Sequence, residues 1–155
     1  MTNIQLNTEE TSTADDFSFN IGFLHESVDP AVVSGALRIE PIIAWKAGDP
    51  MRDHFRNSSY WYGELFRGSE QAFEEGLNVI ESTLTGQQQF CQDFIASGGE
   101  IEVTLNHKVH ASLIPRESDS ESAGTKTKLV ELSLYPKFLQ VLVVLDIGLR
   151  LQIWS

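Results

Sequence analysis

Two short aromatic runs in the first half of the chain are separated by a polar loop, a combination that suits a small-ligand pocket. One run ends at Trp45, and the other contains Trp61 and Tyr62. Aromatic walls with a few hydrogen-bonding groups are typical of ligand sites, and the loop supplies a guanidinium, a carboxylate and an imidazole. The sequence thus predicts a pocket at the edge of a sheet, lined by Trp45, Arg52, Asp53, His54, Trp61 and Tyr62.

The segment around Trp45 also has an architectural interpretation, which we place first. On a strand, Ile43 and Trp45 would share one face and Ala44 would lie on the other. A Trp at the end of such a strand can lie across the rim of the sheet, where its N–H reaches water or a carbonyl. Gly48 would then supply the positive φ of the following turn, and Pro50 would fix the exit of the chain.

Other kinds of chemistry find less support in the sequence. His107 and His110 are three residues apart, a spacing that places them on opposite faces of a strand. Asp49, Asp53 and His54 share one loop, but no metal-binding motif of the His-Glu-x-x-His or EF-hand type is present. A Gly-x-Ser-x-Gly elbow and a phosphate-binding glycine motif are also missing. We therefore predict no metal, no cofactor and no catalytic residues.

The charge of the chain bears on its partners. Eleven Lys and Arg residues stand against 22 Asp and Glu residues, which gives a formal net charge of −11. A chain without a basic stripe is a poor ligand for DNA, RNA or an anionic membrane, because few counterions would be released on binding. The same charge would steer the protein toward a basic protein partner, although acidic domains are also common for solubility alone.

Localisation is predicted from cysteine content and hydropathy. The single cysteine, Cys91, excludes an internal disulfide framework and suits a reducing cytoplasm. It falls on the apolar side of a predicted helix, where it would act as a small hydrophobic residue. The first residues lack the pattern of a signal peptide, and no apolar run approaches the roughly 20 residues of a membrane helix. We expect a cytoplasmic protein.

The spacing of apolar residues predicts one domain after a short tail. Residues 1–16 are acidic and Thr-rich and should be disordered, and residues 17–155 should form a single α+β domain. Residues 115–127 read as a flexible loop, and Gly86 marks a kink in the longest helix. The patterns predict strands at about 17–24, 42–46, 60–66, 101–109, 130–134 and 149–153, and helices at about 30–38, 70–97 and 136–146.

This order of elements indicates a fold class. The first six elements match a ferredoxin-like βαββαβ core, and a C-terminal βαβ extends it. The apolar faces of the strands are one-sided, so helices should cover one face of a largely antiparallel sheet. An exposed edge strand, such as the last one, could pair with a second copy in a homodimer.

The chain resembles a known family in several of these features. They include the segment Pro41-x-x-x-Trp45-x-x-Gly48 after the first helix, Trp61, a long helix ending in Gly98-Gly99, and the ending Gly-Leu-Arg-Leu-Gln-Ile-Trp. In these the chain resembles the bacterial family catalogued as domain of unknown function 4279, over roughly residues 17–154. The resemblance implies a small α+β domain and no particular reaction.

These observations leave two functions open. The first expectation is a non-catalytic protein-binding module of the inhibitor or immunity type, in which an acidic surface masks a basic partner. The alternative is a small-molecule-binding regulatory domain with its pocket near Trp45 and Trp61. An enzyme comes third, because the sequence offers no recognisable catalytic group.

Overall fold

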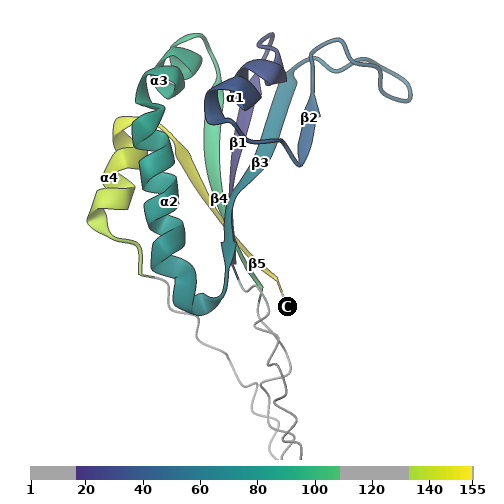
Figure 1. Cartoon of the computed structure of the whole chain (residues 1–155). Coiled ribbons are helices and arrows are strands. Elements are labelled where there is room, and N and C mark those ends of the chain that lie inside the picture. Colours follow the sequence, from purple (N-terminus) through teal and green to yellow (C-terminus); the bar gives the residue numbers. More distant parts are fainter. Residues whose placement is uncertain (1–16, 109–132, 155) are drawn as a thin grey trace, which may run out of the picture.

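The computed structural model describes residues 17–108 and 133–154, which form a mixed α+β fold with one sheet (Figure 1). The expected tail over 1–16 and the loop over 115–127 lie outside the described residues. The elements are β1 (Phe17–His25), α1 (Pro30–Leu37), β2 (Ile43–Trp45), β3 (Ser59–Gly68), the 3₁₀ turn η1 (Glu70–Ala72), α2 (Phe73–Gly86), α3 (Gln88–Ala96), β4 (Glu100–Lys108), α4 (Pro136–Val144) and β5 (Gly148–Trp154).

The sheet has five strands in the order β2-β3-β1-β4-β5 and is mostly antiparallel. Strand β1 lies at its centre and pairs antiparallel with β3 on one side and with β4 on the other. Only the pairing of β4 with β5 is parallel among the described strands. The predicted α+β class with a largely antiparallel sheet is thus confirmed.

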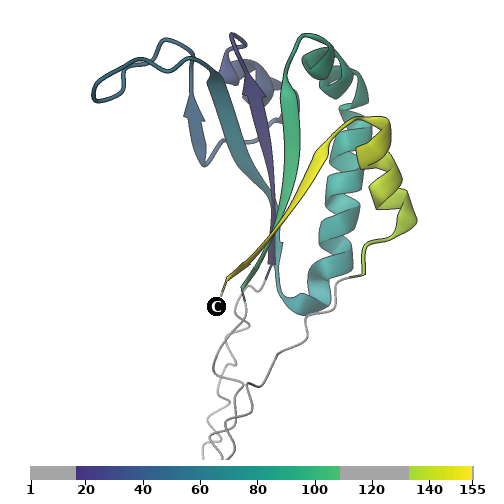
Figure 2. The same cartoon turned by 180° about the vertical axis from the view of Figure 1, so that it is seen from behind.

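One face of the sheet carries the core. The alternating apolar residues of β1 and β4 point to this face, as their period of two predicts. Helices α2, α3 and α4 lie on the same side of the sheet in both views (Figures 1 and 2). The buried side chains that join the two layers include Phe19, Ile21, Phe23, Leu77, Ile80, Leu84, Val103, Leu105, Phe138 and Leu142.

Capping residues explain where the first helix begins. Asp29 accepts a hydrogen bond from the backbone N–H of Ala31 at 2.9 Å, and Pro30 occupies the first helical turn. An Asp followed by a Pro favours both features at the start of a helix. Ser69, in contrast, is of a residue type that often caps helices, but it makes no side-chain capping bond to the helical segment that follows it. The 3₁₀ turn η1 precedes α2 instead and begins the helical segment.

The long helix predicted over residues 70–97 is divided. α2 ends at Gly86, Gln87 leaves helical geometry with a φ of −114° and a ψ of 23°, and α3 begins at Gln88. The kink expected at Gly86 is therefore a break one residue further on. A strand expected over 130–134 lies mostly outside the described residues, and its last residue, Leu134, has no strand geometry.

The other face of the sheet is not covered by any helix of the described residues. It is the face of the even-numbered residues of β1 and β4, and we call it the open face. Among the described residues, no helix has both the length and the apolar character needed to cross a membrane. Because helices cover only the core face, a ligand site on the sheet itself would lie on the open face.

Candidate functional site

Trp61 belongs to the core and not to a surface pocket. Its ring is 1% exposed and meets Phe23 edge-on, with ring centres 5.8 Å apart. Its Nε1 donates a hydrogen bond to the Ser34 Oγ of α1 at 2.9 Å. Gly63, two residues later on the same face, leaves room for the indole, because a Cβ there would collide with the ring. Trp61 thus attaches α1 to the sheet.

Trp45 lies on the opposite face of the sheet from Trp61. Cross-strand pairing places Trp45 beside Tyr60 and Ile43 beside Tyr62, while Ala44 is the partner of Trp61. The Trp45 ring packs on Tyr60, with ring centres 4.7 Å apart. The expected pocket walled by Trp45, Trp61 and Tyr62 is therefore not assembled, because neighbouring residues of one strand point to opposite faces.

The chain between β2 and β3 forms a projecting arm over residues 46–58, seen at the upper right of Figure 1. Gly48 has the predicted positive φ, at 90°. Two backbone hydrogen bonds hold the two sides of the arm together: Arg56 N–H donates to the Asp49 carbonyl, and Gly48 N–H donates to the Arg56 carbonyl. The guanidinium carbon of Arg56 lies 4.1 Å from the centre of the Trp45 ring, a cation–π contact. The architectural interpretation of Trp45 therefore fits its contacts.

The three polar candidates of this segment, Arg52, Asp53 and His54, all lie exposed toward the tip of the arm. They line neither of the two open-face hollows described below. Asp49 accepts a hydrogen bond from the backbone N–H of Lys46 at 2.7 Å, so its carboxylate closes the turn. Within residues 17–108 and 133–154, no three His, Cys, Asp or Glu side chains gather as a metal site would require.

His107 and Cys91 both lie in the core. His107 is buried and stacks on Phe17, with ring centres 4.3 Å apart. Cys91 is completely buried, and burial raises the pKa of its thiol to about 11. Such a thiol stays protonated at neutral pH and is a poor nucleophile. His110, the other histidine of the strand pattern, lies outside the described residues.

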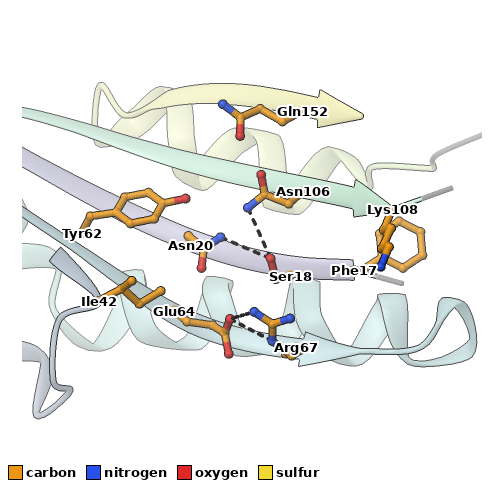
Figure 3. Close-up of a pocket in the computed structure, with 10 residues that line it drawn as sticks. All are labelled: Phe17, Ser18, Asn20, Ile42, Tyr62, Glu64, Arg67, Asn106, Lys108 and Gln152. Atoms are coloured by element: carbon orange, nitrogen blue, oxygen red, sulfur yellow. Dashed lines mark hydrogen bonds and ion pairs between the residues drawn. The ribbon is translucent and has the colours of Figure 1, made fainter. Parts of the chain in front are cut away.

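A row of polar side chains crosses the centre of the open face. Ser18 and Asn20 of β1 pair with Asn106 and Thr104 of β4, and each pair shares one face. The amide nitrogens of Asn20 and Asn106 each donate to the Ser18 Oγ at 3.3 Å (Figure 3). Because that oxygen accepts both bonds, the Ser18 hydroxyl hydrogen is left to act as a donor.

Asn20 is the most unusual member of this row. Its side chain is 3% exposed, yet its Oδ1 has no hydrogen-bond partner in the part of the chain that the structure describes. A buried acceptor without a partner costs about 1–3 kcal/mol of stability. In Figure 3 this oxygen points toward β3, on the side of Tyr62 and Glu64. This oxygen is well placed to accept a hydrogen bond from a bound molecule.

Asn20 forms part of the floor of a hollow of about 360 Å³ on the open face. Volumes of this order suit a small molecule. One side is formed by the aromatic ring of Tyr62, and an ion pair between Glu64 and Arg67 lies along β3 (Figure 3). The residues that line the hollow are Phe17, Ser18, Asn20, Ile42, Tyr62, Glu64, Arg67, Asn106, Lys108 and Gln152.

A β-bulge in β3 creates the ion pair of the hollow. Phe19 pairs with Phe66 and Asn20 pairs with Glu64, so Leu65 is an extra residue in β3. In a regular strand, residues three apart point to opposite faces, but the extra residue brings Glu64 and Arg67 to the same face. The two Arg67 nitrogens that bond Glu64 both donate to its Oε2, at 3.0 and 2.6 Å.

A smaller hollow of about 210 Å³ adjoins the first one, and Tyr62 lines both. Here Glu102 of β4 pairs with Arg150 of β5 at 3.1 Å. Partial burial, and then the neighbouring Tyr62 and Glu102, raise the pKa of Tyr60, so its hydroxyl remains a donor at neutral pH. The open face thus presents donors, acceptors and aromatic rings side by side.

Of the residues predicted for a site, only Tyr62 lines the larger hollow. Sequence reasoning missed Ser18, Asn20 and Asn106, although the signal was present. These polar residues alternate with apolar ones along β1 and β4, a pattern that places them opposite the core but does not show that they gather in one hollow. A comparison of the chain with protein-family models, curated proteins and solved structures found no match.

Proposed function

We propose that this protein is a non-catalytic module that binds a small polar molecule on the open face of its sheet. The observation that carries this proposal is the buried Asn20, whose Oδ1 lacks a partner among the described residues and lines a polar hollow. A buried acceptor without a partner opposes folding. A ligand that donates a hydrogen bond to this oxygen would remove that cost and would explain why a polar residue lies there. We propose the pocket beside Tyr62, in place of the one expected near Trp45 and Trp61.

A thermal-shift experiment tests this function. Any molecule that binds only the folded chain raises its Tm by mass action. We would screen free amino acids, monosaccharides, nucleosides and dicarboxylic acids against the wild-type chain and against the variant Asn20→Leu. The proposal requires at least one compound that raises the Tm of the wild type and not that of the variant. Equal shifts for both chains, or none at all, would count against it.

A protein partner is the second candidate, and the arm favours it. Phe55 is 70% exposed near the tip, and Arg56 stacks on Trp45 at the base. Exposed aromatic and Arg side chains are the types that contribute most to protein interfaces. We propose that the net charge of −11 steers a basic partner toward the chain, while the arm supplies the short-range contacts.

Pull-down experiments at low and high salt test this second candidate. The variant Phe55→Ser should abolish capture of a specific basic protein, and low salt should favour that capture. Val143→Ser is the matched control, because Val143 is a similarly exposed apolar residue on α4, away from the arm. If both variants retain the partner, the arm is not the contact surface.

The fold also supports a finer proposal, a ferredoxin-like core extended by α4 and β5. The strands β2-β3-β1-β4 are antiparallel throughout, with α1 between β1 and β2 and the α2–α3 pair between β3 and β4. A split βαβ unit has its strands and helices in this order, and we propose that these elements form one. We likewise propose membership of the family of domain of unknown function 4279, supported by the turn at Trp45 and Gly48. We also propose a cytoplasmic location, supported by the cysteine content of one residue, Cys91, which suits a reducing compartment.

A further inference from the structure

We infer that the larger open-face hollow binds a neutral sugar ring, whose hydroxyl groups donate to Asn20 and Glu64 and whose C–H face packs on Tyr62. The inference rests on the proposed function and names its ligand class. It is drawn from two acceptors that lie together in the hollow, and from the way in which the charged residues beside them compensate one another.

The two acceptors lie side by side on neighbouring strands. Asn20 of β1 and Glu64 of β3 are direct cross-strand partners on the open face, which brings their side chains together. Ser18 accepts a hydrogen bond from the amide nitrogen of Asn20, and the Asn20 oxygen is turned toward β3 (Figure 3). Both bonds from Arg67 go to Oε2 of Glu64, which leaves Oε1 as an acceptor for a bound molecule.

The charges beside these acceptors compensate one another. Arg67 donates to Glu64 at 3.0 and 2.6 Å, so this carboxylate already has its counter-ion within the lining. The other cation of the lining, Lys108, is four residues along β4 beyond Thr104, the partner of Asn20. Four residues of a strand span roughly 13 Å, which is too far for a group on a single ring at Asn20. Among the lining residues of the hollow, a molecule at Asn20 therefore meets donors and acceptors without an excess of charge.

Sugar hydroxyls match this arrangement because each one can both donate and accept a hydrogen bond. Two neighbouring hydroxyls of a ring can donate to Asn20 Oδ1 and to Glu64 Oε1. The Ser18 hydroxyl accepts from two asparagine amides, so its hydrogen can be donated to another oxygen of the sugar. The bond to Glu64 is charge-assisted, which makes it stronger than a bond between neutral groups.

Tyr62 supplies an aromatic surface beside the acceptors. Its ring lines the hollow, and its hydroxyl is directed toward Asn20 (Figure 3). Tyr60 lies next to it on the same face of β3, with ring centres 6.2 Å apart. The face of an aromatic ring is negative, so it attracts the weakly positive C–H groups on the flat side of a sugar ring. A sugar therefore has both the hydroxyl groups and the apolar face that this combination of residues fits.

Charged molecules match the hollow less well. A carboxylate at this place would face Asn20 Oδ1 and Glu64, two acceptors that offer it no hydrogen. An ammonium could donate to both, but it would add a second cation beside Arg67, which already pairs with Glu64. A metal ion would find one carboxylate in the lining of this hollow, too few acidic ligands for a hard cation.

Isothermal titration calorimetry of the full chain with neutral hexoses and pentoses, such as glucose, galactose, mannose and xylose, tests the inference. For a sugar that binds, the monodeoxy derivatives remove its hydroxyls one at a time. We expect at least one derivative to bind the wild type about tenfold more weakly, because it leaves the buried Asn20 oxygen unpaired. The same derivative should show little further loss in the variant Asn20→Leu. Because the ligand is neutral, its affinity should be equal at low and at high salt.

Two results of these titrations would overturn the inference. One is a deoxy series in which no position depends on Asn20. The other is an affinity that falls steeply with salt, because a charged group would then contribute to binding.

Variants locate the sugar in the hollow. Asn20→Leu removes the acceptor at similar volume and should weaken binding at least about tenfold, while its Tm stays equal or rises because an unpaired polar group is removed. Tyr62→Leu removes the aromatic ring and should also weaken binding, and Tyr62→Phe should recover most of the affinity. Lys137→Met is the control, because Lys137 pairs with Glu81 on the helical side of the molecule. Unchanged affinity of Asn20→Leu or of Tyr62→Leu would overturn the inference.

The outcomes separate this inference from the proposed function. If an amino acid, a dicarboxylic acid or a nucleoside binds in an Asn20-dependent way and no sugar does, the ligand class is wrong and the open-face site stands. If no compound of any class binds in an Asn20-dependent way, both fall.

Discussion

At the residue scale, the hydrogen bond from Trp61 to Ser34 should contribute to stability, because its donor is buried. Ser34→Ala would leave the indole N–H of Trp61 without its partner inside the core. We expect a loss of about 1–3 kcal/mol in the free energy of unfolding, measured by urea denaturation. Ser34→Thr retains a hydroxyl and should recover part of the loss. Wild-type stability for the alanine variant would mean that the bond is unimportant.

Cys91 gives a prediction for thiol chemistry. Because burial raises the pKa of this thiol to about 11, almost none of it is thiolate at neutral pH. The folded chain should therefore react with a disulfide reagent many times more slowly than the chain in urea, where the thiol is exposed. The release of the coloured thiol product measures both rates. Comparable rates would contradict the buried position of Cys91.

Asp29 gives a prediction for pH dependence. The hydrogen bond from Lys46, at 2.8 Å, is the largest cause that lowers the pKa of this carboxyl below its ordinary value of 3.8. A lowered folded pKa means that the contribution to stability is present above pH 3.8 and is lost as the pH falls through the folded value. Both groups are exposed, so the effect should be small.

The variant Asp29→Asn isolates this charge, because asparagine is also a good N-cap. Wild type should lose more stability than the variant when urea titrations at neutral pH and at acidic pH are compared. If the free energy of unfolding of the two proteins falls equally with pH, the charge of Asp29 and its pair with Lys46 do not contribute to stability.

At the scale of elements, the close approach of α2 to the sheet depends on Gly76. A Cβ at this position would lie 2.5 Å from the Phe19 ring and 2.8 Å from the Phe66 ring. Overpacking of this kind outweighs the better helix propensity of alanine, so Gly76→Ala should cost about 1–2 kcal/mol. Gly86→Ala is the control in the same helix, because a Cβ there meets nothing within 4 Å. Equal effects of the two changes on the urea midpoint would contradict this packing.

Several elements could be predicted because one face of each is buried. The alternation of apolar and polar residues in β1 and β4 follows from burial of one face of the sheet. The last helix is likewise buried on one side, at Phe138, Leu142 and Leu145. The orientation of Trp61 could not be predicted in this way. Its neighbours Tyr60 and Tyr62 are aromatic as well, so the strand shows no alternation from which to choose the buried side.

The larger hollow depends on features that a single sequence does not display. The bulge at Leu65 decides that Glu64 and Arg67 share a face, but Gly63, the glycine just before it, makes room for the Trp61 ring and does not by itself reveal the bulge. The strand order brings β1, β3 and β4 together from distant parts of the chain, and pairing of distant strands has no local signal. The sequence shows each polar residue of the hollow, but it does not show that the fold brings them to one place.

At the scale of the whole molecule, one layer of helices leaves a sheet with two different faces and two edges. The edge strand β5 exposes Leu151 and Ile153, and such an edge can pair with a second copy. A homodimer through β5 stays a prediction. Sedimentation of the wild type and of Ile153→Lys at matched concentrations tests it: the variant should shift to the monomer, and a monomeric wild type would exclude the dimer.

The central claim is that the open face binds a small polar molecule, and amide NMR spectra of the isotope-labelled chain test it most directly. We would titrate the chain with a neutral sugar and follow every backbone amide. The account predicts concentration-dependent shifts at Ser18 to Asn20, Tyr62 to Arg67 and Thr104 to Lys108, with little change in α2 and α4. Shifts confined to the helices or to the arm would contradict the claim, as would a spectrum that no amino acid, sugar or nucleoside alters.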